Sequence, residues 1–292
     1  MQTSEQIAVQ AASEVAIAQG FQFQQAIVLQ NLNNIIIHLS PTAEVARVSA
    51  MTVTQRQGDG WFAREVAVAE YLTQVGAPIV PTSRLITPGP HSHLGVVLSF
   101  WEWVQVLESL PDAVQVGRSL FTCHQALKGF SGDLSVLALL SEAGEILEQL
   151  IGQNLIDRTD IVMLRSVSAR SMTTLMQFPL QPIHGDAHFG NVLNTTQGVL
   201  WTDWEDVFFG PIEWDLASLV ESSWVFGTEA GRSEMALRGY GNYDAAALSA
   251  CVEARTLVAL VWSIVMHQAN PSPERQFRID RRLEWLREQT AG

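Results

Sequence analysis

Lysine is almost absent from this sequence. Among the 17 basic side chains in its 292 residues, Lys128 is the single lysine, and the others are arginines. The 30 acidic residues outnumber them, which gives a net charge of −13 at pH 7. Such an acidic balance argues against a nucleic-acid duplex or an anionic membrane surface as the main partner. We therefore expect neither nucleic acid nor membrane as a partner, and the oligomeric state is open.

Cysteine and long apolar runs are also scarce. Cys123 and Cys251 are the two cysteines, and both fall in apolar helical patterns, which predicts buried free thiols of the kind found in a reducing cytoplasm. The longest strongly apolar run, 256–266, is too short to span a bilayer. The N-terminus carries Glu5 and Glu14 among its apolar positions and has no basic region, so it predicts an amphipathic helix instead of a signal peptide. We expect a cytoplasmic protein.

The distribution of apolar residues divides the chain into two parts. Hydrophobic residues make up 47% of the sequence, enough for two lobes with separate cores. The first part combines an N-terminal helix, short β-rich runs and a helix from about Asp59 to Gly76. Long helical patterns with one hairpin dominate the second part. The sequence predicts an α+β fold with a small α+β N-terminal lobe (1–100), a hinge (101–104) and a larger, mostly helical C-terminal lobe (105–292).

One loop concentrates the polar residues that could do chemistry. Residues 182–193 read PIHGDAHFGNVL, and the Pro and two Gly predict a loop that enters a short strand. A metal-dependent hydrolase would use His184, Asp186 and His188 with further ligands from elsewhere, but no other histidine stands in ligand spacing. His184 is better interpreted as a structural residue that bonds the loop backbone. The competing chemistry is phosphoryl transfer.

Phosphoryl transfer from ATP needs a small set of oxygen ligands. Asn191 follows Asp186 by five residues, and Asp203 comes twelve residues later at the end of an apolar run. In such a reaction one carboxylate orients the acceptor hydroxyl and takes its proton, while an amide oxygen and a second carboxylate hold Mg²⁺ against the phosphates. The spacing of these three residues matches that requirement.

Three segments of the chain closely resemble the aminoglycoside phosphotransferase and choline kinase-like family. They are HGDAHFGNVL, WTDWED and GPIEWDLA, the last with Gly210 and Asp215. Upstream, LFTCHQAL resembles a family helix with a Leu-x-x-x-His-x-x-Leu pattern, in which His124 takes the His place. The resemblance extends over about residues 30–220. It implies a bilobal protein-kinase-like fold and an ATP- and Mg²⁺-dependent kinase of a small-molecule hydroxyl, with ATP between the lobes.

The resemblance also implies roles for individual residues. Asp186 matches the catalytic base, and Asn191 and Asp203 match the Mg²⁺ ligands. Glu65 falls where the family has the helix glutamate that pairs with the phosphate-binding base of the small lobe. The positions that would offer hinge backbone groups to adenine are Ser99, Phe100 and Trp101.

Two departures from the family pattern matter. Arg47, in VARVS, occupies the strand position where most relatives have lysine, and arginine keeps the charge but not the geometry. The alternation in VARVS puts Arg47 on the face opposite Ala46 and Val48, where Glu65 is its natural partner. In addition, LQNLNN (29–34) stands where a Gly-rich phosphate-covering loop is expected. These departures keep a rival hypothesis open, a catalytically silent nucleotide-binding or interaction module.

The acceptor cannot be read from the sequence. Four acidic residues of the helical part could contact a polyamine-like or aminoglycoside substrate, although an acidic surface for solubility explains them as well: Glu221, Glu229, Glu234 and Glu253. Four tryptophans could suggest a cation cage of the choline type, but their apolar patterns favour core packing: Trp201, Trp204, Trp214 and Trp262.

Overall fold

The computed structural model describes residues 3–32, 34–49, 60–151 and 156–291. The chain forms two compact units, which we call unit 1 (Met1–Pro111 with Val192–Asp206) and unit 2 (Asp112–Asn191 with Val207–Gly292). The hairpin at the start of the second segment groups with unit 1 because its backbone bonds there: the Val80 amide donates to the Trp201 carbonyl oxygen at 2.8 Å. The sequence-based hinge at 101–104 stays a prediction.

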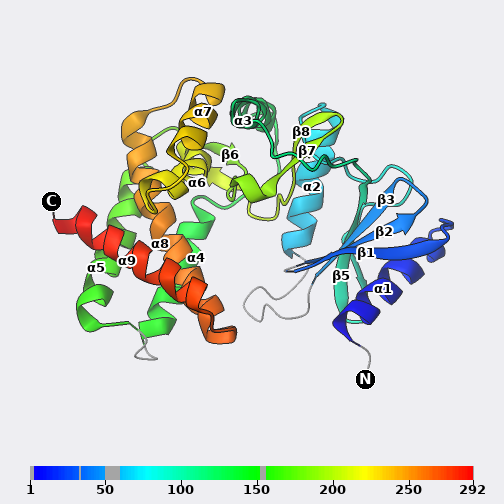
Figure 1. Cartoon of the computed structure of the whole chain (residues 1–292), viewed down its shortest axis with the longest axis horizontal. Helices are drawn as coiled ribbons and strands as arrows, with labels where there is room; N and C mark the ends of the chain where they lie inside the picture. Colours follow the sequence, from blue (N-terminus) through cyan, green and yellow to red (C-terminus); the bar gives the residue numbers. More distant parts are fainter. Residues whose placement is uncertain (1–2, 33, 50–59, 152–155, 292) are drawn as a thin grey trace. The chain divides into compact units, whose positions relative to one another are not determined.

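Unit 1 is built on a five-stranded antiparallel sheet with the order β1-β2-β3-β5-β4 (Figure 1). The two-stranded hairpin β7-β8 belongs to the same unit. The elements of unit 1 are α1 (Ser4–Ala18), β1 (Gln25–Asn31), β2 (Asn34–Ser40), β3 (Glu44–Ser49), α2 (Gly60–Gln74), β4 (His91–His93), β5 (Val96–Glu102), β7 (Val192–Thr195) and β8 (Gly198–Trp201).

The sheet of unit 1 has two unlike faces, because side chains alternate along a strand. One face packs its branched apolar side chains on the alanine stripe of α1, and the core residues there include Ala12, Ile37 and Val48. Arg47 points to the other face, as the VARVS pattern predicts, and it lies beside Ile36 of β2 and Ser99 of β5 in the register. The sheet thus presents an arginine at its centre.

Helix α2 covers that second face and carries a glutamate on its buried side. Phe62, Glu65, Val66 and Leu72 are buried at helical spacing, which makes one continuous stripe. The helix begins at Gly60, while Asp59, where the sequence also allowed a start, lies outside the described residues. A glutamate in an otherwise apolar stripe requires a buried partner.

Unit 2 consists mainly of helices, as the long helical patterns of the second part of the sequence predict. One helix, α7, was not predicted. The elements of unit 2 are α3 (Ala113–Leu127), α4 (Ala138–Ile151), α5 (Arg158–Leu175), β6 (Gln181–Ile183), η1 (Phe189–Asn191), β9 (Phe208–Gly210), α6 (Glu213–Trp224), α7 (Ala230–Tyr240), α8 (Ala245–Ala269) and α9 (Pro273–Ala291).

Helices α3 and α7 cross at two glycines. A Cβ on Gly117 would lie 2.0 Å from the Ala236 carbonyl oxygen, and a Cβ on Gly239 would lie 2.1 Å from the Val114 carbonyl oxygen. Neither position can accept a larger residue without moving a helix backbone. The close approach fixes α7, and with it Tyr240, against the helix that carries the family histidine.

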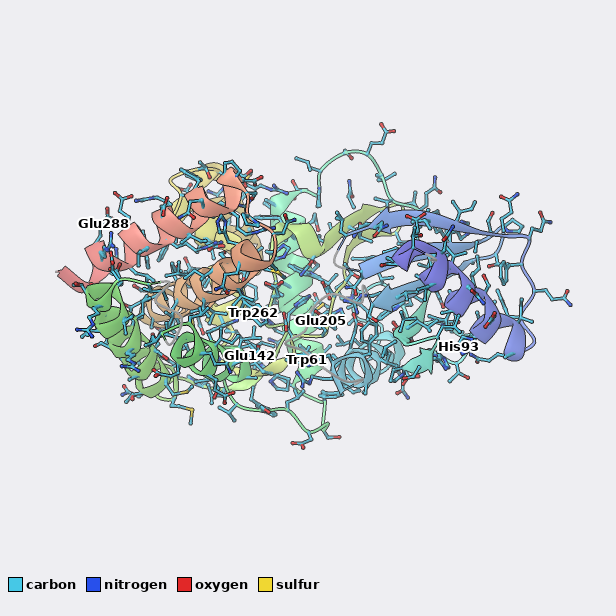
Figure 2. The ribbon with its side chains drawn as sticks, turned by 90° about the horizontal axis from the view of Figure 1, so that it is seen from below. Trp61, His93, Glu142, Glu205, Trp262 and Glu288 are labelled. Atoms are coloured by element: carbon cyan, nitrogen blue, oxygen red, sulfur yellow. The ribbon has the colours of Figure 1, made fainter. Side chains whose placement is uncertain are left out.

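Helix α8 packs on α4, α5, α6 and α9 and is the central helix of unit 2. By length and composition it could cross a membrane, and half of its most apolar stretch is buried inside the protein. Its C-terminal half is less covered, and Trp262 there is only partly buried (Figure 2). Cys251 on this helix and Cys123 on α3 are buried free thiols, as predicted.

Candidate active site

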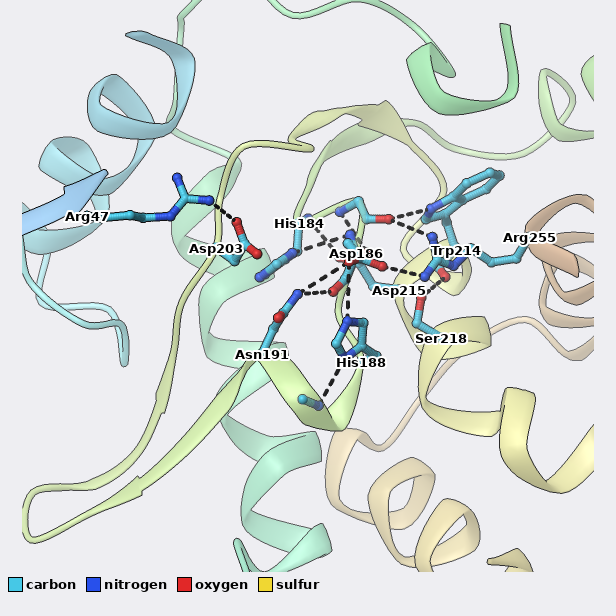
Figure 3. Close-up of polar contacts among 12 residues, drawn as sticks. Arg47, His184, Asp186, His188, Asn191, Asp203, Trp214, Asp215, Ser218 and Arg255 are labelled. Atoms are coloured by element: carbon cyan, nitrogen blue, oxygen red, sulfur yellow. Dashed lines mark hydrogen bonds and ion pairs between the residues drawn. The ribbon is translucent and has the colours of Figure 1, made fainter. Parts of the chain in front are cut away.

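The loop that carries Asp186 is anchored through its backbone by a buried carboxylate. Asp215, in the first turn of α6, accepts from the His184 amide at 2.7 Å and from the Gly185 amide at 2.9 Å. Gly185 has a φ of +87°, a conformation that glycine adopts without strain. Trp214 donates its Nε1–H to the Gly185 carbonyl oxygen at 2.8 Å. Helix α6 therefore fixes the path of the loop (Figure 3).

A buried chain of side chains extends this anchor to two further helices. His124 Nε2 of α3 lies 2.8 Å from Asp215 Oδ2, and His124 Nδ1 lies 2.8 Å from the Tyr240 hydroxyl of α7. Because the carboxylate can only accept, Nε2 carries the proton and the Tyr240 hydroxyl donates to Nδ1. Asp215 and His124 thus lock the loop backbone to α3, α6 and α7.

The Asp186 carboxylate lies between two basic side chains. Arg255 Nη2 donates to Asp186 Oδ1 at 2.5 Å, and His188 Nε2 lies 3.3 Å from Asp186 Oδ2. Burial by itself would raise the pKa of Asp186, but the Arg255 guanidinium and the His188 ring outweigh it and hold the pKa well below its usual range. The carboxylate, 27% exposed, is therefore ionised and able to accept a hydrogen bond.

Asn191 is tied to the same residue by its amide nitrogen. Its Nδ2 donates to the Asp186 carbonyl oxygen at 2.9 Å. The Gly190 amide donates to His188 Nδ1 at 2.9 Å, so the His188 hydrogen sits on Nε2 and points to Asp186. His184 accepts from the Asp186 amide at Nδ1 (3.3 Å), the backbone contact expected of a structural histidine.

In unit 1, Arg47 gathers three carboxylates around one guanidinium. Its Nη1 donates to Glu65 Oε2, and its Nη2 donates to Asp203 Oδ1 and to Glu205 Oε2, both at 2.8 Å. The Arg47 side chain is 7% exposed and also lies over the Phe62 ring. Burial would lower the pKa of Arg47, but the three carboxylates outweigh it and raise the pKa. The structure thus brings Arg47, Glu65 and Asp203 together.

The same cluster favours a proton on its most buried acid. Burial, followed by the charges of Asp203 and Glu205, raises the pKa of Glu65 to about 8, although Arg47 lowers it in part. Asp203 is 34% exposed and has a φ of +65°, a left-handed conformation that Asp tolerates better than most residues. This backbone turn follows β8 and directs the carboxylate toward Arg47.

The oxygen donors expected to hold a metal are of the right kind. Asp203 supplies a partly exposed carboxylate, and Asn191 supplies an amide oxygen whose nitrogen is already engaged. Hard cations such as Mg²⁺ prefer these ligands together with phosphate oxygens. Among the described residues, no group of three or more His, Cys, Asp or Glu side chains is placed to hold a metal ion.

The three residues expected at the hinge lie inside β5. The Phe100 amide donates to the Pro88 carbonyl oxygen at 2.8 Å, its carbonyl accepts from the Ser83 amide at 3.0 Å, and Ser99 Oγ accepts from Trp101 Nε1 at 2.8 Å. Their role toward adenine stays a prediction. In the segment 29–34, Asn33 lies outside the described residues.

A model of the phosphotransferase enzyme family matches residues 61–250. The matched part is well over half of the chain and contains the anchored loop, Asn191 and Asp203. The chain belongs to the phosphotransferase enzyme family. No curated protein matches the chain.

Solved structures of other kinases share the fold of this phosphotransferase. The amicoumacin kinase hAmiN in complex with AMP-PNP, Ca²⁺ and Ami is 15% identical, with a TM-score of 0.70 over 95% of this chain and 93% of that one. A choline/ethanolamine kinase family protein from Mesorhizobium loti is 16% identical, with a TM-score of 0.67 over 97% and 94%. Choline kinase LicA from Streptococcus pneumoniae is 14% identical, with a TM-score of 0.67 over 94% and 97%. The predicted α+β, protein-kinase-like fold is confirmed.

Three of the four acidic residues of this phosphotransferase that were candidates for a cationic acceptor have arginine partners, and the fourth, Glu234, is exposed. Arg282 Nε lies 2.8 Å from Glu221 Oε1, Arg232 Nη1 lies 3.8 Å from Glu229 Oε2, and Arg170 bonds Glu253. Three of the tryptophans considered for a cation cage are fully buried in the core, as predicted: Trp201, Trp204 and Trp214.

Sequence reasoning missed Arg255. The residue lies 69 positions from Asp186, so no local motif links the two. A signal was nevertheless present, because Arg255 and Glu253 are the two charged residues of the 25-residue apolar helix α8. A charge in the middle of a core helix implies a specific partner.

Proposed function

We propose that this phosphotransferase is an ATP- and Mg²⁺-dependent kinase of a small-molecule hydroxyl, similar to aminoglycoside phosphotransferases. The observation that carries the proposal is the Asp186 loop. Its backbone is anchored by Asp215, its carboxylate is ionised beside Arg255, and its carbonyl orients the Asn191 amide. A carboxylate fixed in this way can orient a hydroxyl and take its proton, which is what phosphoryl transfer asks of a protein.

The remaining groups take the roles that the sequence suggests. Asn191 and Asp203 would hold Mg²⁺, which when bound neutralises charge on the phosphates. Arg47 would bind a phosphate, and Glu65 would hold Arg47 in place. The face of the sheet that carries Arg47 also carries two apolar side chains, Val45 two positions before it in β3 and Ile36 opposite it in β2. Such a surface next to a phosphate-binding arginine suits the base and sugar of a nucleotide.

The acidic side chains also bear on the class of acceptor. Solved relatives include a spectinomycin phosphotransferase with ADP and spectinomycin and an APH(2")-IIIa with kanamycin. In this chain Glu221, Glu229 and Glu253 are each paired with arginine and Glu234 is exposed, so three of the four candidate acids are already engaged. We propose a hydroxyl compound that does not depend on several positive charges, phosphorylated in the cytoplasm.

The rival is a catalytically silent relative that binds nucleotide or another protein. Arg47 in place of lysine favours it, whereas the ordered Asp186 loop favours an enzyme. In the silent relative there would be no phosphate transfer for a substitution at Asp186 to lower.

A nucleotide-binding experiment separates the two. In the parent protein, Mg²⁺ should increase the rise in melting temperature that ATP causes. Asp203→Ala should lose most of this increase, because the other proposed metal ligand, Asn191, is neutral. The matched control is Asp133→Ala, which removes an exposed acid of unit 2. ATP turnover is then measured against choline, ethanolamine, spectinomycin and a panel of neutral alcohols. Nucleotide binding without turnover on any alcohol would favour the silent relative.

A further inference from the structure

Helix α8 places one arginine where an apolar residue is expected. Arg255 is flanked by Ala254, Thr256 and Leu257, all of which are fully buried. Its own side chain is 12% exposed and reaches the Asp186 loop (Figure 3). Burying a guanidinium in this position is costly unless it is paired. The Asp186 loop supplies the partner that this buried charge requires.

The guanidinium contacts the loop at two points. Nη2 donates to Asp186 Oδ1 at 2.5 Å, and Nη1 donates to the Gly185 carbonyl oxygen at 3.4 Å. The Trp214 ring lies beneath it, with the guanidinium carbon 6.0 Å from the ring centre. The planar side chain therefore joins the Asp186 carboxylate to the loop backbone and rests on the residue that anchors that backbone.

The other partners of the Asp186 carboxylate come from its own loop. His188 Nε2 lies 3.3 Å from Oδ2, and Asn191 Nδ2 lies 3.4 Å from the same oxygen. Asp215 and Trp214 bind the loop backbone and do not reach this carboxylate. Within the described part of unit 2, Arg255 is thus the side chain from another element that holds the Asp186 carboxylate.

We propose that Arg255 is the positioning residue for Asp186 in the proposed phosphotransfer, and the inference rests on that function. It holds Oδ1 with a short, charge-assisted bond, while Oδ2 keeps only two long contacts. An acceptor hydroxyl can replace these weak contacts at Oδ2 without moving the carboxylate. Arg255 therefore leaves Oδ2 as the oxygen that accepts from the acceptor hydroxyl, and it keeps the Asp186 carboxylate in a fixed orientation.

A purely structural ion pair is the alternative, and other arginines of unit 2 show what that looks like. Arg170 of α5 bonds Glu253 of α8, two positions from Arg255, without touching the loop. The Arg170 side chain is exposed, and its loss should change the kinetics with neither ATP nor the alcohol. Arg170→Gln is therefore the matched control, because it also removes an ion pair made by α8.

The experiment measures transfer from ATP to the alcohol of the panel that accepts phosphate fastest. Arg255→Ala should lower kcat by about a hundredfold, because a misplaced base costs this much even when it is intact. The KM for ATP should stay at the parental value, and Arg255→Lys should recover part of kcat. Millimolar guanidinium chloride should raise the rate of Arg255→Ala but not that of Asp186→Asn. Arg170→Gln should behave like the parent.

A crystal structure of Arg255→Ala supplies a readout that does not depend on activity. We expect the Asp186 carboxylate to leave its position while the loop backbone, held by Asp215, stays. A carboxylate that keeps its place, or a parental kcat in Arg255→Ala, overturns the inference. Absence of transfer by the parent chain overturns the proposed function instead, and the crystal structure still decides whether Arg255 positions Asp186.

Discussion

At the scale of single residues, the cluster around Arg47 shows why an arginine can replace lysine in this chain. A lysine ammonium is a point charge, whereas the planar guanidinium offers two separate terminal nitrogens. In unit 1, Nη1 serves Glu65 and Nη2 serves Asp203 and Glu205. One residue thus bonds a buried glutamate and the partly exposed carboxylate expected to hold metal.

Replacement of Arg47 should affect the use of ATP. A charge-assisted contact contributes about 1.5–3 kcal/mol, so Arg47→Ala should weaken kcat/KM for ATP by roughly ten- to a hundredfold. Arg47→Lys should recover part of the loss, since it keeps the charge without the fork. The control is Arg84→Ala, which removes an exposed arginine of the same unit. Parental kinetics in Arg47→Ala would mean that another group binds the phosphates.

The raised pKa of Glu65 makes stability depend on pH. The folded protein binds this proton more tightly than the unfolded chain, so the stabilisation is full below the ordinary pKa of 4.5 and is lost as the pH rises through about 8. Glu65→Gln stays neutral at every pH. We would measure the free energy of unfolding of both proteins by urea titration in EDTA. The value for Glu65→Gln minus that of the parent should increase as the pH rises from 4.5 to about 8.

The control for this pH series lies on the exposed side of the same helix. Glu70→Gln should keep a constant offset from the parent across the range, because residue 70 is exposed. A constant offset for Glu65→Gln as well would show that Glu65 stays ionised beside Arg47.

Sequence reasoning assigned roles to residues close together in the chain, and these roles stay predictions, but it missed a distant residue. Asp186, Asn191 and Asp203 fall in one short stretch, so their spacing alone indicates shared chemistry. Arg255 acts on Asp186 across 69 positions, and only folding brings them together. His124 and Asp215 were recognised as family positions, but their function as loop anchors depends on three helices that no local pattern relates.

At the scale of secondary-structure elements, the long helices, the β-rich runs of unit 1 and the hairpin β7-β8 were predictable, whereas α7, β6 and β9 were not. Helix α8 has 25 residues with a strong apolar content, so its existence is evident from sequence. Helix α7 has eleven residues, includes two glycines and has little apolar surface, which predicts a loop. Close packing on α3 supplies the stabilisation that the low helix propensity of this segment does not. Strands β6 and β9 have three residues each and are recognisable only through their pairing.

The two glycines of α7 offer a matched test of this packing. A Cβ on Gly239 would meet the Val114 carbonyl oxygen at 2.1 Å, whereas a Cβ on Gly231 meets nothing within 4 Å. Gly239→Ala should therefore destabilise the protein by about 1–3 kcal/mol through overpacking. Gly231→Ala should be neutral or stabilise by up to about 1 kcal/mol. Urea unfolding of both variants decides it, and equal effects would mean that α7 is not held by close contact.

At the scale of the whole molecule, the residues to which we assign roles are divided between the two compact units. Asp186 and Asn191 belong to unit 2, and Arg47 and Asp203 belong to unit 1. The family resemblance anticipated the fold because its motifs fall on the segments that anchor and carry the site. It could not anticipate the contact-based grouping of Val192–Asp206 with the first unit, since that depends on backbone bonds between distant segments.

The most direct test of the central claim is the rate of phosphate transfer from ATP in the parent protein and in Asp186→Asn, each with Mg²⁺ and the best alcohol acceptor. The substitution keeps the size of the side chain but removes the proton acceptor. The account predicts that turnover falls by roughly two orders of magnitude or more while ATP affinity changes little. Asp133→Asn, at an exposed position, should match the parent. An Asp186→Asn protein that keeps most of the parental rate would contradict the account.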